Sequence, residues 1–354
     1  MNSKIFILTI SVLLLIKCND GNNHAVFLES TAENIISKIS MSNSLSEFLK
    51  PVRIIKISSE SKDGLFGKID DIGIWQNGFV IMDSYVSRKV LHFNNNGLFN
   101  CMIGRHGDGP GEYRQPICIH INSKGELIIL NNNPCDFHIY SKPSEFKNTI
   151  TSRRFKGFFD PYRIKSIDSL MVCFVIGRGN DRVHLLNEKF EILNSFLPDE
   201  PQQKIVMYRA GDLCVVDDKY IWIAGAFDPR ILILDKNGNV IKTTGLQYLS
   251  RDNILKPSDI SHEKYDAIRE KSSIKSIINI NNKIIIIGPF IFNGILHYDI
   301  YNTNGDVIKE MMPLGEKWQR PIGSLDSFLC CCDMDGPEID EKTNAILTLY
   351  KLDI

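Results

Sequence analysis

One strand pattern recurs six times along the 354-residue chain, and this recurrence limits the possible fold more than any other feature. Each copy contains a five-residue run that is mostly apolar, which is typical of a buried β-strand. The six runs are Phe79–Asp83, Leu127–Asn131, Met171–Val175, Tyr220–Ala224, Lys283–Ile287 and Phe328–Cys332. Successive runs start about 44 to 63 residues apart, which is enough for four strands and their loops. The pattern therefore predicts a ring of similar four-stranded units.

Turn chemistry supports this four-stranded unit. Residues 94–97, 235–238 and 302–305 each follow a third strand, begin with Asn or Asp and end in Gly. These residue types tolerate the positive φ of tight hairpin turns. The last copy shows only three strands, whereas a spare strand, residues 52–57, precedes the first copy. Joining the two would remove an exposed sheet edge. We therefore predict an all-β fold over residues 52–354: a six-bladed β-propeller of four-stranded antiparallel blades, closed by an N-terminal strand that joins the last blade.

The first 17 residues have the pattern of an export signal. Residues 5–16 form a nearly uninterrupted apolar run that is too short for a stable transmembrane helix. Cys18 follows at the position where bacterial lipoproteins are lipidated, although Lys17 stands where that motif prefers a small residue. We expect a signal peptide over 1–17, and a lipid tether at Cys18 with a short N-terminal segment over 18–51. Plain secretion and an uncleaved anchor are the alternatives.

Composition excludes some classes of partner. Lys and Arg number 41 and Asp and Glu 42, so the formal net charge is −1. We therefore expect no nucleic-acid partner, and contact with a membrane only through the lipid. Eight further cysteines contain no C-x-x-C pair, so the spacing of a zinc site is missing. Most of them lie in apolar strands, where cysteine behaves as a small buried hydrophobe.

The segment Gly104–Pro116, which joins the first two copies, has four glycines in its first eight residues. Such a turn needs positive φ or close backbone approach at several positions. It is not a phosphate-binding P-loop, because no Gly-Lys-Ser/Thr follows. One interpretation is that backbone N–H groups, with Arg105 and Arg114, bind an anionic or hydroxyl-rich ligand. The other is a structural joint in which Tyr113 packs between blades.

These segments carry a family resemblance. The matching positions are Asp83, Arg88, Phe93 and Gly97, the joint Gly104–Pro116 and the strand 52–57. Together they resemble the NHL-type six-bladed β-propellers, and most closely the six-bladed propeller lipoproteins of Bacteroidetes. The motif is specific over the first two blades, whereas the later blades match only by strand pattern. The resemblance implies an outer-membrane lipoprotein, on its periplasmic or surface side. It implies no activity, because most members of that family have none assigned.

Propeller geometry sorts the loops without coordinates. The connection that leaves a second strand and the connection between blades emerge at the same end of the ring. The candidate ligand-binding residues at that end are Arg88, Arg105, His106, Asp108, Glu112, Arg114, Arg178, Arg182, Asp228 and Arg230. Binding residues concentrate on loops held by a rigid scaffold. The insertion 246–276, between blades four and five, belongs to the same end. It is either a short helix over the channel mouth or a surface excursion.

The histidines do not predict a metal site. His92, His138, His184 and His297 fall near third strands, but only His138 and His184 share one register. A ring of ligands would require one register around the channel. We therefore expect structural histidines, no metal and no cofactor. No nucleophile motif appears either, so we assign no catalytic residue.

The leading functional interpretation is a monomeric, non-catalytic binding or scaffolding module of the cell envelope, with a saccharide or peptide bound at the loop-rich face. The rival is a lyase or hydrolase that uses Arg, His and carboxylate residues at the channel mouth, with or without a metal, as some related propellers do. A third hypothesis is a sensor or assembly partner that recognises another envelope protein.

Overall fold

The computed structural model describes residues 44–132, 134–151, 161–175, 181–198, 211–225, 230–245, 274, 276–292, 295–313, 320–334, 339 and 343–354. These residues form β-strands and two short 3-10 helices, η1 (Leu45–Phe48) and η2 (Lys62–Gly64). In the ranges just given, no helix has the length and apolar character needed to cross a membrane. The signal segment, Cys18 and most of the insertion 246–276 lie outside the described residues.

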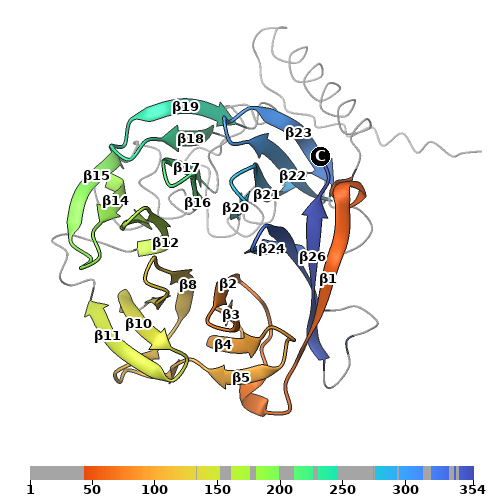
Figure 1. Ribbon diagram of the computed structural model, residues 1–354. Helices are drawn as coiled ribbons and strands as arrows, with labels where there is room; N and C mark the ends of the chain where they lie inside the picture. The colour runs from red at the N-terminus through yellow and green to blue at the C-terminus, as the bar shows by residue number, and fades with distance from the viewer. Residues whose placement is uncertain are drawn as a thin grey trace, which may run out of the picture. The chain divides into compact units, whose positions relative to one another are not determined.

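Six four-stranded antiparallel sheets stand as blades around a central axis (Figure 1). Blade one contains β2 (Asp71–Trp75), β3 (Gly78–Asp83), β4 (Lys89–Asn94) and β5 (Phe99–Met102). Blade two contains β8 (Pro116–Ile121), β9 (Leu127–Asn131), β10 (Asp136–Lys142) and β11 (Glu145–Thr151). Blade three contains β12 (Pro161–Ile167), β13 (Leu170–Val175), β14 (Asp181–Leu186) and β15 (Ile192–Pro198).

The remaining blades repeat the arrangement. Blade four contains β16 (Gly211–Val216), β17 (Tyr220–Gly225), β18 (Arg230–Leu234) and β19 (Val240–Gly245). Blade five contains β20 (Ser276–Ile280), β21 (Ile284–Phe292), β22 (Ile295–Asn302) and β23 (Val307–Pro313). Blade six contains β24 (Arg320–Leu325), β25 (Phe328–Asp333), β26 (Thr343–Leu352) and β1 (Leu49–Ser58). A short parallel pair, β6 (Arg105–His106) and β7 (Glu112–Tyr113), lies between blades one and two.

The predicted propeller and its closure are confirmed. Strand β1 pairs antiparallel with β26, so blade six combines strands from both ends of the ring. The strand starts at Leu49 rather than residue 52, and η1 precedes it directly. Leu45 of η1 is fully buried in the cluster between blades five and six. The folded ring therefore begins before the predicted boundary, because an apolar residue upstream of β1 covers part of its core.

The core lies between the faces of neighbouring blades, which explains why the second strands are apolar on both sides. Successive side chains of a strand point to opposite faces. In β3, Val80 and Met82 pack in the cluster shared with blade two, whereas Phe79 and Ile81 pack in the cluster shared with blade six. Each second strand must therefore be apolar over most of its length, which produces the nearly continuous runs seen in the sequence.

The predicted hairpin turns form as their side chains require. The Asp235 carboxylate accepts the backbone N–H groups of Asn237 and Asn239, at 2.8 and 2.9 Å. The Asn302 side-chain oxygen does the same for Asn304 and Asp306, at 3.0 and 2.9 Å. These bonds satisfy turn N–H groups that would otherwise lack protein partners, so the side chain at the start of each turn determines its shape.

Candidate functional site at the loop-rich end and in the central channel

The loops that meet at one end of the ring are described mainly for blades one and two. They are residues 59–70, 84–88, 103–115 and 132–135. Backbone bonds confirm that they share an end: the N–H of Asn132 donates to the carbonyl of Gln115 at 2.8 Å. The segment 59–70, which leads from β1 into blade one, was not among the predicted site loops. Its place follows from the closure of the ring, which makes it an inter-blade connection.

The glycine-rich segment is a tightly packed joint between blades one and two. Tyr113 is fully buried, and its hydroxyl donates to the Ile103 carbonyl at 2.7 Å while accepting the Val90 N–H at 3.0 Å. The Tyr140 hydroxyl of blade two donates to the Gly111 carbonyl at 2.6 Å. Two buried tyrosines therefore hold the joint from both blades, which favours its structural interpretation.

The charges of the joint pair within it. Arg105 Nε lies 2.5 Å from Glu112 Oε1. Arg114 donates two hydrogen bonds to the Asp108 carboxylate, of 2.6 and 2.7 Å. The bonds from Arg114 lower the pKa of Asp108, and the Gly109 N–H together with Arg105 lowers that of Glu112. Both carboxylates therefore stay ionised, and both guanidinium groups are already engaged. This arrangement weakens the hypothesis that Arg105 and Arg114 bind a ligand.

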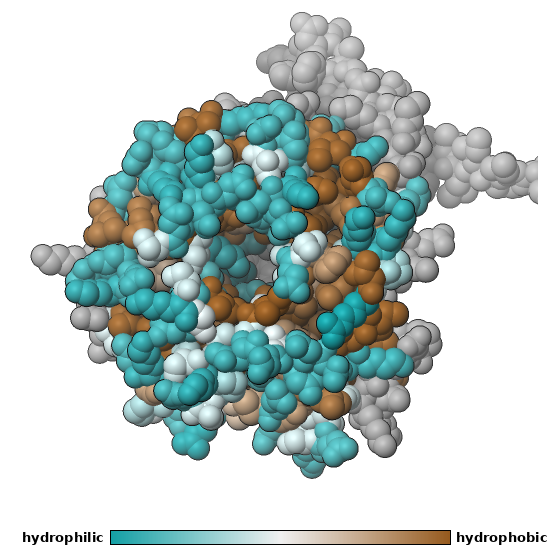
Figure 2. All heavy atoms as spheres, in the orientation of Figure 1, coloured by the Kyte–Doolittle hydropathy of each residue, from teal (hydrophilic) through white to brown (hydrophobic). Residues whose placement is uncertain are grey.

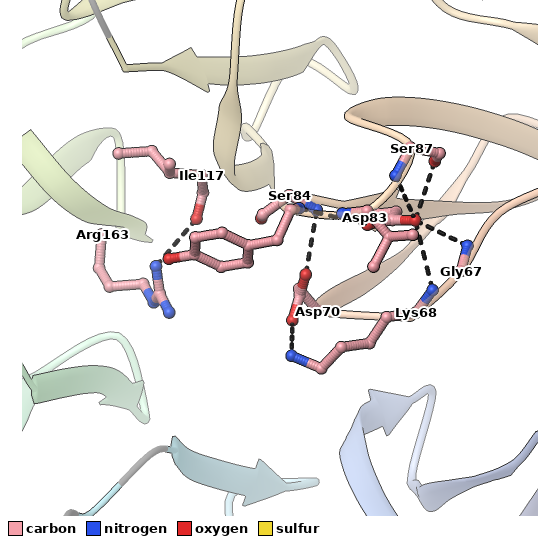
Figure 3. Close-up of polar contacts among 10 residues, drawn as sticks. Gly67, Lys68, Asp70, Asp83, Ser84, Ser87, Ile117 and Arg163 are labelled. Carbon is pink, nitrogen blue, oxygen red and sulfur yellow. Dashed lines mark hydrogen bonds and ion pairs between the residues drawn. The ribbon is translucent and has the colours of Figure 1, made fainter. Parts of the chain in front are cut away.

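A second polar cluster surrounds Asp83 at the end of β3 (Figure 3). One carboxylate oxygen accepts the N–H groups of Gly67, Lys68 and Ser87 and the Ser87 hydroxyl, at 2.8 to 3.3 Å. The other accepts the N–H groups of Tyr85 and Val86, at 3.2 and 2.9 Å. Burial raises the pKa of Asp83, but these hydrogen bonds outweigh it and hold the pKa below its usual value. Asp83 thus orders loops 59–70 and 84–88.

Asp70 adds to this cluster from the loop before β2. Its carboxylate accepts the Ser84 N–H at 3.0 Å and forms an ion pair with Lys68. The sequence motif that contains Asp83 therefore has a structural explanation: the carboxylate replaces the backbone partners that two adjacent loops lack.

The other predicted site residues are scattered. His106 and Arg88 are exposed, and Arg182 is buried with its guanidinium 5.0 Å from the Phe174 ring centroid. Arg230 is half-buried at the start of β18. Arg178 and Asp228 lie outside the described residues. Among these residues, the structure pairs Arg105 with Glu112 and Arg114 with Asp108. His106 also lies close enough to Asp108 for its charge to help lower the pKa of that carboxyl.

The innermost strands enclose a cavity of about 380 Å³ along the central channel. Its wall takes residues from β2, β8, β12, β16, β20 and β24, so all six blades contribute. Figure 2 shows this hollow at the centre of the ring, with both hydrophilic and hydrophobic residues at its rim. The charged residues of the wall are Asp70, Asp71, Arg163, Lys165, Asp212 and Asp218. None of these six was predicted as a site residue.

Two aspartates of the wall join neighbouring blades. Asp71 accepts the N–H of Ile119, in β8, at 3.1 Å. Asp212 accepts the N–H of Ile277, in β20, at 2.9 Å and lies 3.2 Å from Arg163 Nε. Each carboxylate thus replaces a backbone acceptor between two first strands that do not hydrogen-bond to each other as a sheet.

Basic and neutral groups complete the wall. Arg163 donates to the carbonyl of Ile117 at 2.9 Å (Figure 3) and stacks on the Tyr162 ring, 4.2 Å from its centroid. His120 lies 2.7 Å from the Ser166 hydroxyl, and burial lowers its pKa to about 3, so its imidazole is neutral. Lys165 is half-buried and makes no hydrogen bond or ion pair with any residue that the structure describes.

Electrostatics sets the protonation of the wall. Burial raises the pKa of Asp212, and the nearby charges of Arg163 and Lys165 oppose that rise without cancelling it. Burial by itself would lower the pKa of Lys165, but the attraction of Asp71 and other nearby groups reverses the effect, so the ammonium form is favoured. The wall therefore holds a stable cation beside carboxylates that already have partners.

A sequence signal for this wall existed. Arg163 and Lys165 alternate with Tyr162 and Ile164 in β12, so one face of a first strand is basic and the other apolar. Which face lines the channel depends on how six distant blades assemble.

The histidines of the third strands have structural partners. His138 Nδ1 lies 2.9 Å from the Thr149 hydroxyl, and His184 Nδ1 lies 2.8 Å from that of Ser195, so their shared register produces the same contact in two blades. His92, one position off, contacts the Trp75 carbonyl at 3.3 Å through Nε2 and the Asn100 side chain at 3.1 Å through Nδ1. Among the residues that the structure describes, no group of three or more His, Cys, Asp or Glu side chains could hold a metal ion.

Fold and channel together define a six-bladed β-propeller with a polar central channel. The chain belongs to the DUF5128 family of 6-bladed β-propellers, whose model matches residues 25–312. No protein with a curated description matches the sequence.

Solved structures share the fold. A protein from Bacteroides fragilis that is assigned as exported is 16% identical, with a TM-score of 0.67 over 88% of this chain and 97% of its own. A DUF4221-family member from Bacteroides vulgatus is 11% identical, with a TM-score of 0.61 over 86% and 97%. Virginiamycin B lyase from Staphylococcus aureus is 13% identical, with a TM-score of 0.54 over 84% and 99%. At these identities the likeness concerns the fold alone.

Proposed function

We propose that this protein is a binding module of the bacterial cell envelope, which holds a small saccharide or peptide without transforming it. The ligand sits in the central channel. The observation that carries the proposal is the cavity of about 380 Å³, lined by polar side chains from all six blades. Small-molecule sites usually occupy about 300–1,000 Å³ and place a few polar groups in fixed positions.

The fixed positions are provided by the contacts between blades. Asp71, Asp212 and Arg163 each bond to the backbone of an adjacent blade, so the wall is ordered before a ligand arrives. Preorganisation of this kind lowers the entropic cost of binding. Asp83 likewise orders loops 59–70 and 84–88 next to blade one, by accepting their backbone N–H groups.

The proposed location is the outer membrane, with the monomeric propeller tethered by a lipid on Cys18. The apolar segment 5–16 followed by Cys18 supports export and lipidation. The likeness to an exported protein of Bacteroides fragilis agrees with this location. The variant Cys18→Ala should leave the membrane pellet for the soluble fraction. If it still sediments with membranes, the lipid is not the anchor.

An enzyme is the second candidate, and Asp212 is the observation that favours it. Its raised pKa and its contact with Arg163 inside a channel are features of acid–base residues. The fold shared with virginiamycin B lyase shows that a propeller of this kind is compatible with lyase chemistry in another protein. Asp212 also has a structural task, the bond to Ile277, which accounts for its position without catalysis.

One experiment separates the two candidates. The purified full chain is screened by thermal shift against neutral and acidic oligosaccharides and short peptides, and each hit is recovered and analysed by mass spectrometry. A ligand at a hundredfold excess over its Kd should stabilise the native state by about 2.7 kcal/mol. Recovery of unchanged ligand supports a binding module. Recovery of a product, lost in Asp212→Asn, would replace the proposal by the enzyme.

A further inference from the structure

The most unusual side chain of the channel is Lys165. It lines the cavity from β12 and is half-buried, yet its ammonium has no hydrogen-bond acceptor and no ion-pair partner among the described residues. A lysine carries three N–H donors, and burying them without acceptors is costly. Arg163, two residues earlier on the same strand, pairs with Asp212 and donates hydrogen bonds to the backbone carbonyls of Ile117 and Tyr162. Lys165 therefore differs from its neighbour in having donors to offer.

The carboxylates of the wall do not accept hydrogen bonds from the Lys165 ammonium. The Asp71 carboxylate accepts the N–H groups of Ile72 and Ile119. The Asp212 carboxylate forms an ion pair with Arg163 and accepts the N–H of Ile277. Both carboxylates attract Lys165 through space, but neither lies within ion-pair distance of it. The wall therefore keeps Lys165 charged and leaves its donors open to the cavity.

Resting on the proposed binding function, we infer that Lys165 anchors the carboxylate of a monoanionic ligand in the channel. A carboxylate forms short, charge-assisted hydrogen bonds to an ammonium group. Its two sources within the proposed ligand classes are an acidic sugar and a peptide with a free carboxylate. The shared chemistry, one carboxylate on a small polar body, is what the channel recognises.

The charge of the wall limits the ligand to a single negative charge. The charged residues that line the cavity are four aspartates, Asp70, Asp71, Asp212 and Asp218, against Arg163 and Lys165. A monocarboxylate can pair with Lys165 locally, whereas a polyanion would bring further charges close to the aspartates. Phosphate and sulfated saccharides should therefore bind more weakly than a uronic acid of similar size.

The test uses matched ligands on the full chain. Galacturonic acid is compared with galactose, and N-acetyl-Gly-Gly with its C-terminal amide, by isothermal titration at pH 7. Inorganic phosphate is the polyanion control. We expect the carboxylate member of at least one pair to bind about ten- to a hundredfold more tightly than its neutral partner. Which pair responds identifies the source of the carboxylate.

Variants connect the preference to the side chain. Lys165→Met should remove the difference between the paired ligands, and Lys165→Arg, which keeps the charge, should retain much of it. Lys283→Met is the control, because Lys283 is exposed in the turn between β20 and β21. Melting curves without ligand confirm that each variant is folded. If Lys165→Met does not fold, Lys165→Arg still tests the role of the side chain.

The outcomes are distinct. If ligands bind but in neither pair does the acid bind more tightly than its neutral partner, the binding function stands and the role of Lys165 is wrong. If the carboxylate preference persists in Lys165→Met, or phosphate binds best, the inference is overturned. If none of these ligands binds, the inference fails, while the broader ligand screen still decides the proposed function.

Discussion

The carboxylate of Asp212 accepts the backbone N–H of Ile277 at 2.9 Å, so one side chain of blade four holds the first strand of blade five. The same relationship links Asp71 to Ile119 between blades one and two. First strands of neighbouring blades diverge and cannot pair as a sheet. Side chains must therefore satisfy the backbone that faces the channel.

Asp83→Asn should destabilise the fold strongly although the two side chains have the same shape. The amide turns one acceptor into a donor that faces the N–H groups of Gly67 and Ser87, and it leaves buried donors unsatisfied. We expect a loss of about 2–4 kcal/mol, measured by urea denaturation. Glu60→Gln, at an exposed position, should change stability by less than about 0.5 kcal/mol. Equal losses in both variants would contradict the role of Asp83.

The pH dependence of the Asp83 effect has a definite sign. The pKa of this carboxyl is lowered in the folded state, so its contribution to stability is present above its unfolded pKa and is lost as the pH falls through the folded value. The difference between the native protein and Asp83→Asn should therefore shrink in strong acid. Denaturation of both proteins from pH 6 downwards measures it, and a constant difference would show that ionisation is irrelevant.

Tyr113→Phe tests the joint between blades one and two. The variant keeps the buried ring but removes the hydroxyl that serves the Ile103 carbonyl and the Val90 N–H. Two buried backbone groups would lose their partner, at a cost of about 1–3 kcal/mol. Tyr220→Phe, at a half-buried position on β17, is the control and should cost less. A neutral Tyr113→Phe would mean that the joint is held by packing alone.

Gly104→Ala and Gly125→Ala form a matched pair, because both glycines have positive φ, +64° and +73°. A Cβ at Gly125 would meet nothing within 4 Å. Gly125→Ala therefore measures only the cost of holding a residue with a Cβ at positive φ, about 1–2 kcal/mol. A Cβ at Gly104 would lie 2.5 Å from both the Gly111 carbonyl oxygen and the Tyr140 hydroxyl. Gly104→Ala should therefore cost about 1–3 kcal/mol more than Gly125→Ala in thermal melts. Equal costs would show that the joint can relax.

Acid should destabilise the protein well above the range in which carboxylates titrate. Burial lowers the pKa of His120 to about 3 and that of His138 to about 4. Between these values and the usual histidine value near 6.5, the unfolded chain binds more protons, so stability falls as the pH decreases. Each group contributes at most about 1.4 kcal/mol per pH unit. Urea titrations from pH 7.5 to 4.5 measure the slope, which should become shallower in His120→Asn.

If His120→Asn leaves the slope unchanged while the protein stays folded, His120 does not supply the proton linkage. His138→Asn then tests the second histidine, whose contact with Thr149 lies on the outer side of blade two rather than in the channel.

The fold could be predicted from the sequence because its determinants are local. Apolar runs produce the second strands, Asn or Asp followed by Gly produces the hairpin turns, and the unmatched strand before blade one closes the ring against β26. Tyr113 could also be placed between blades, since a large aromatic residue in a glycine-rich turn has few other positions open to it.

The candidate site could be predicted only in part. Strand order predicted which loops share an end of the ring, but the sequence does not show that Arg105 pairs with Glu112 or Arg114 with Asp108. Whether a charged side chain is free to bind depends on its distance from a partner, and that distance is set by the path of the turn.

The sequence by itself determined six copies of a β-unit, the way the copies close, and the buried character of each second strand. Only the tertiary structure decided that Asp71, Lys165 and Asp212 meet around one channel, because they come from three blades and their local patterns do not refer to one another. Strand formation depends on neighbours a few residues away. The chemistry of the channel depends on which faces of distant strands turn toward a common axis, and that is fixed by the packing of the blades.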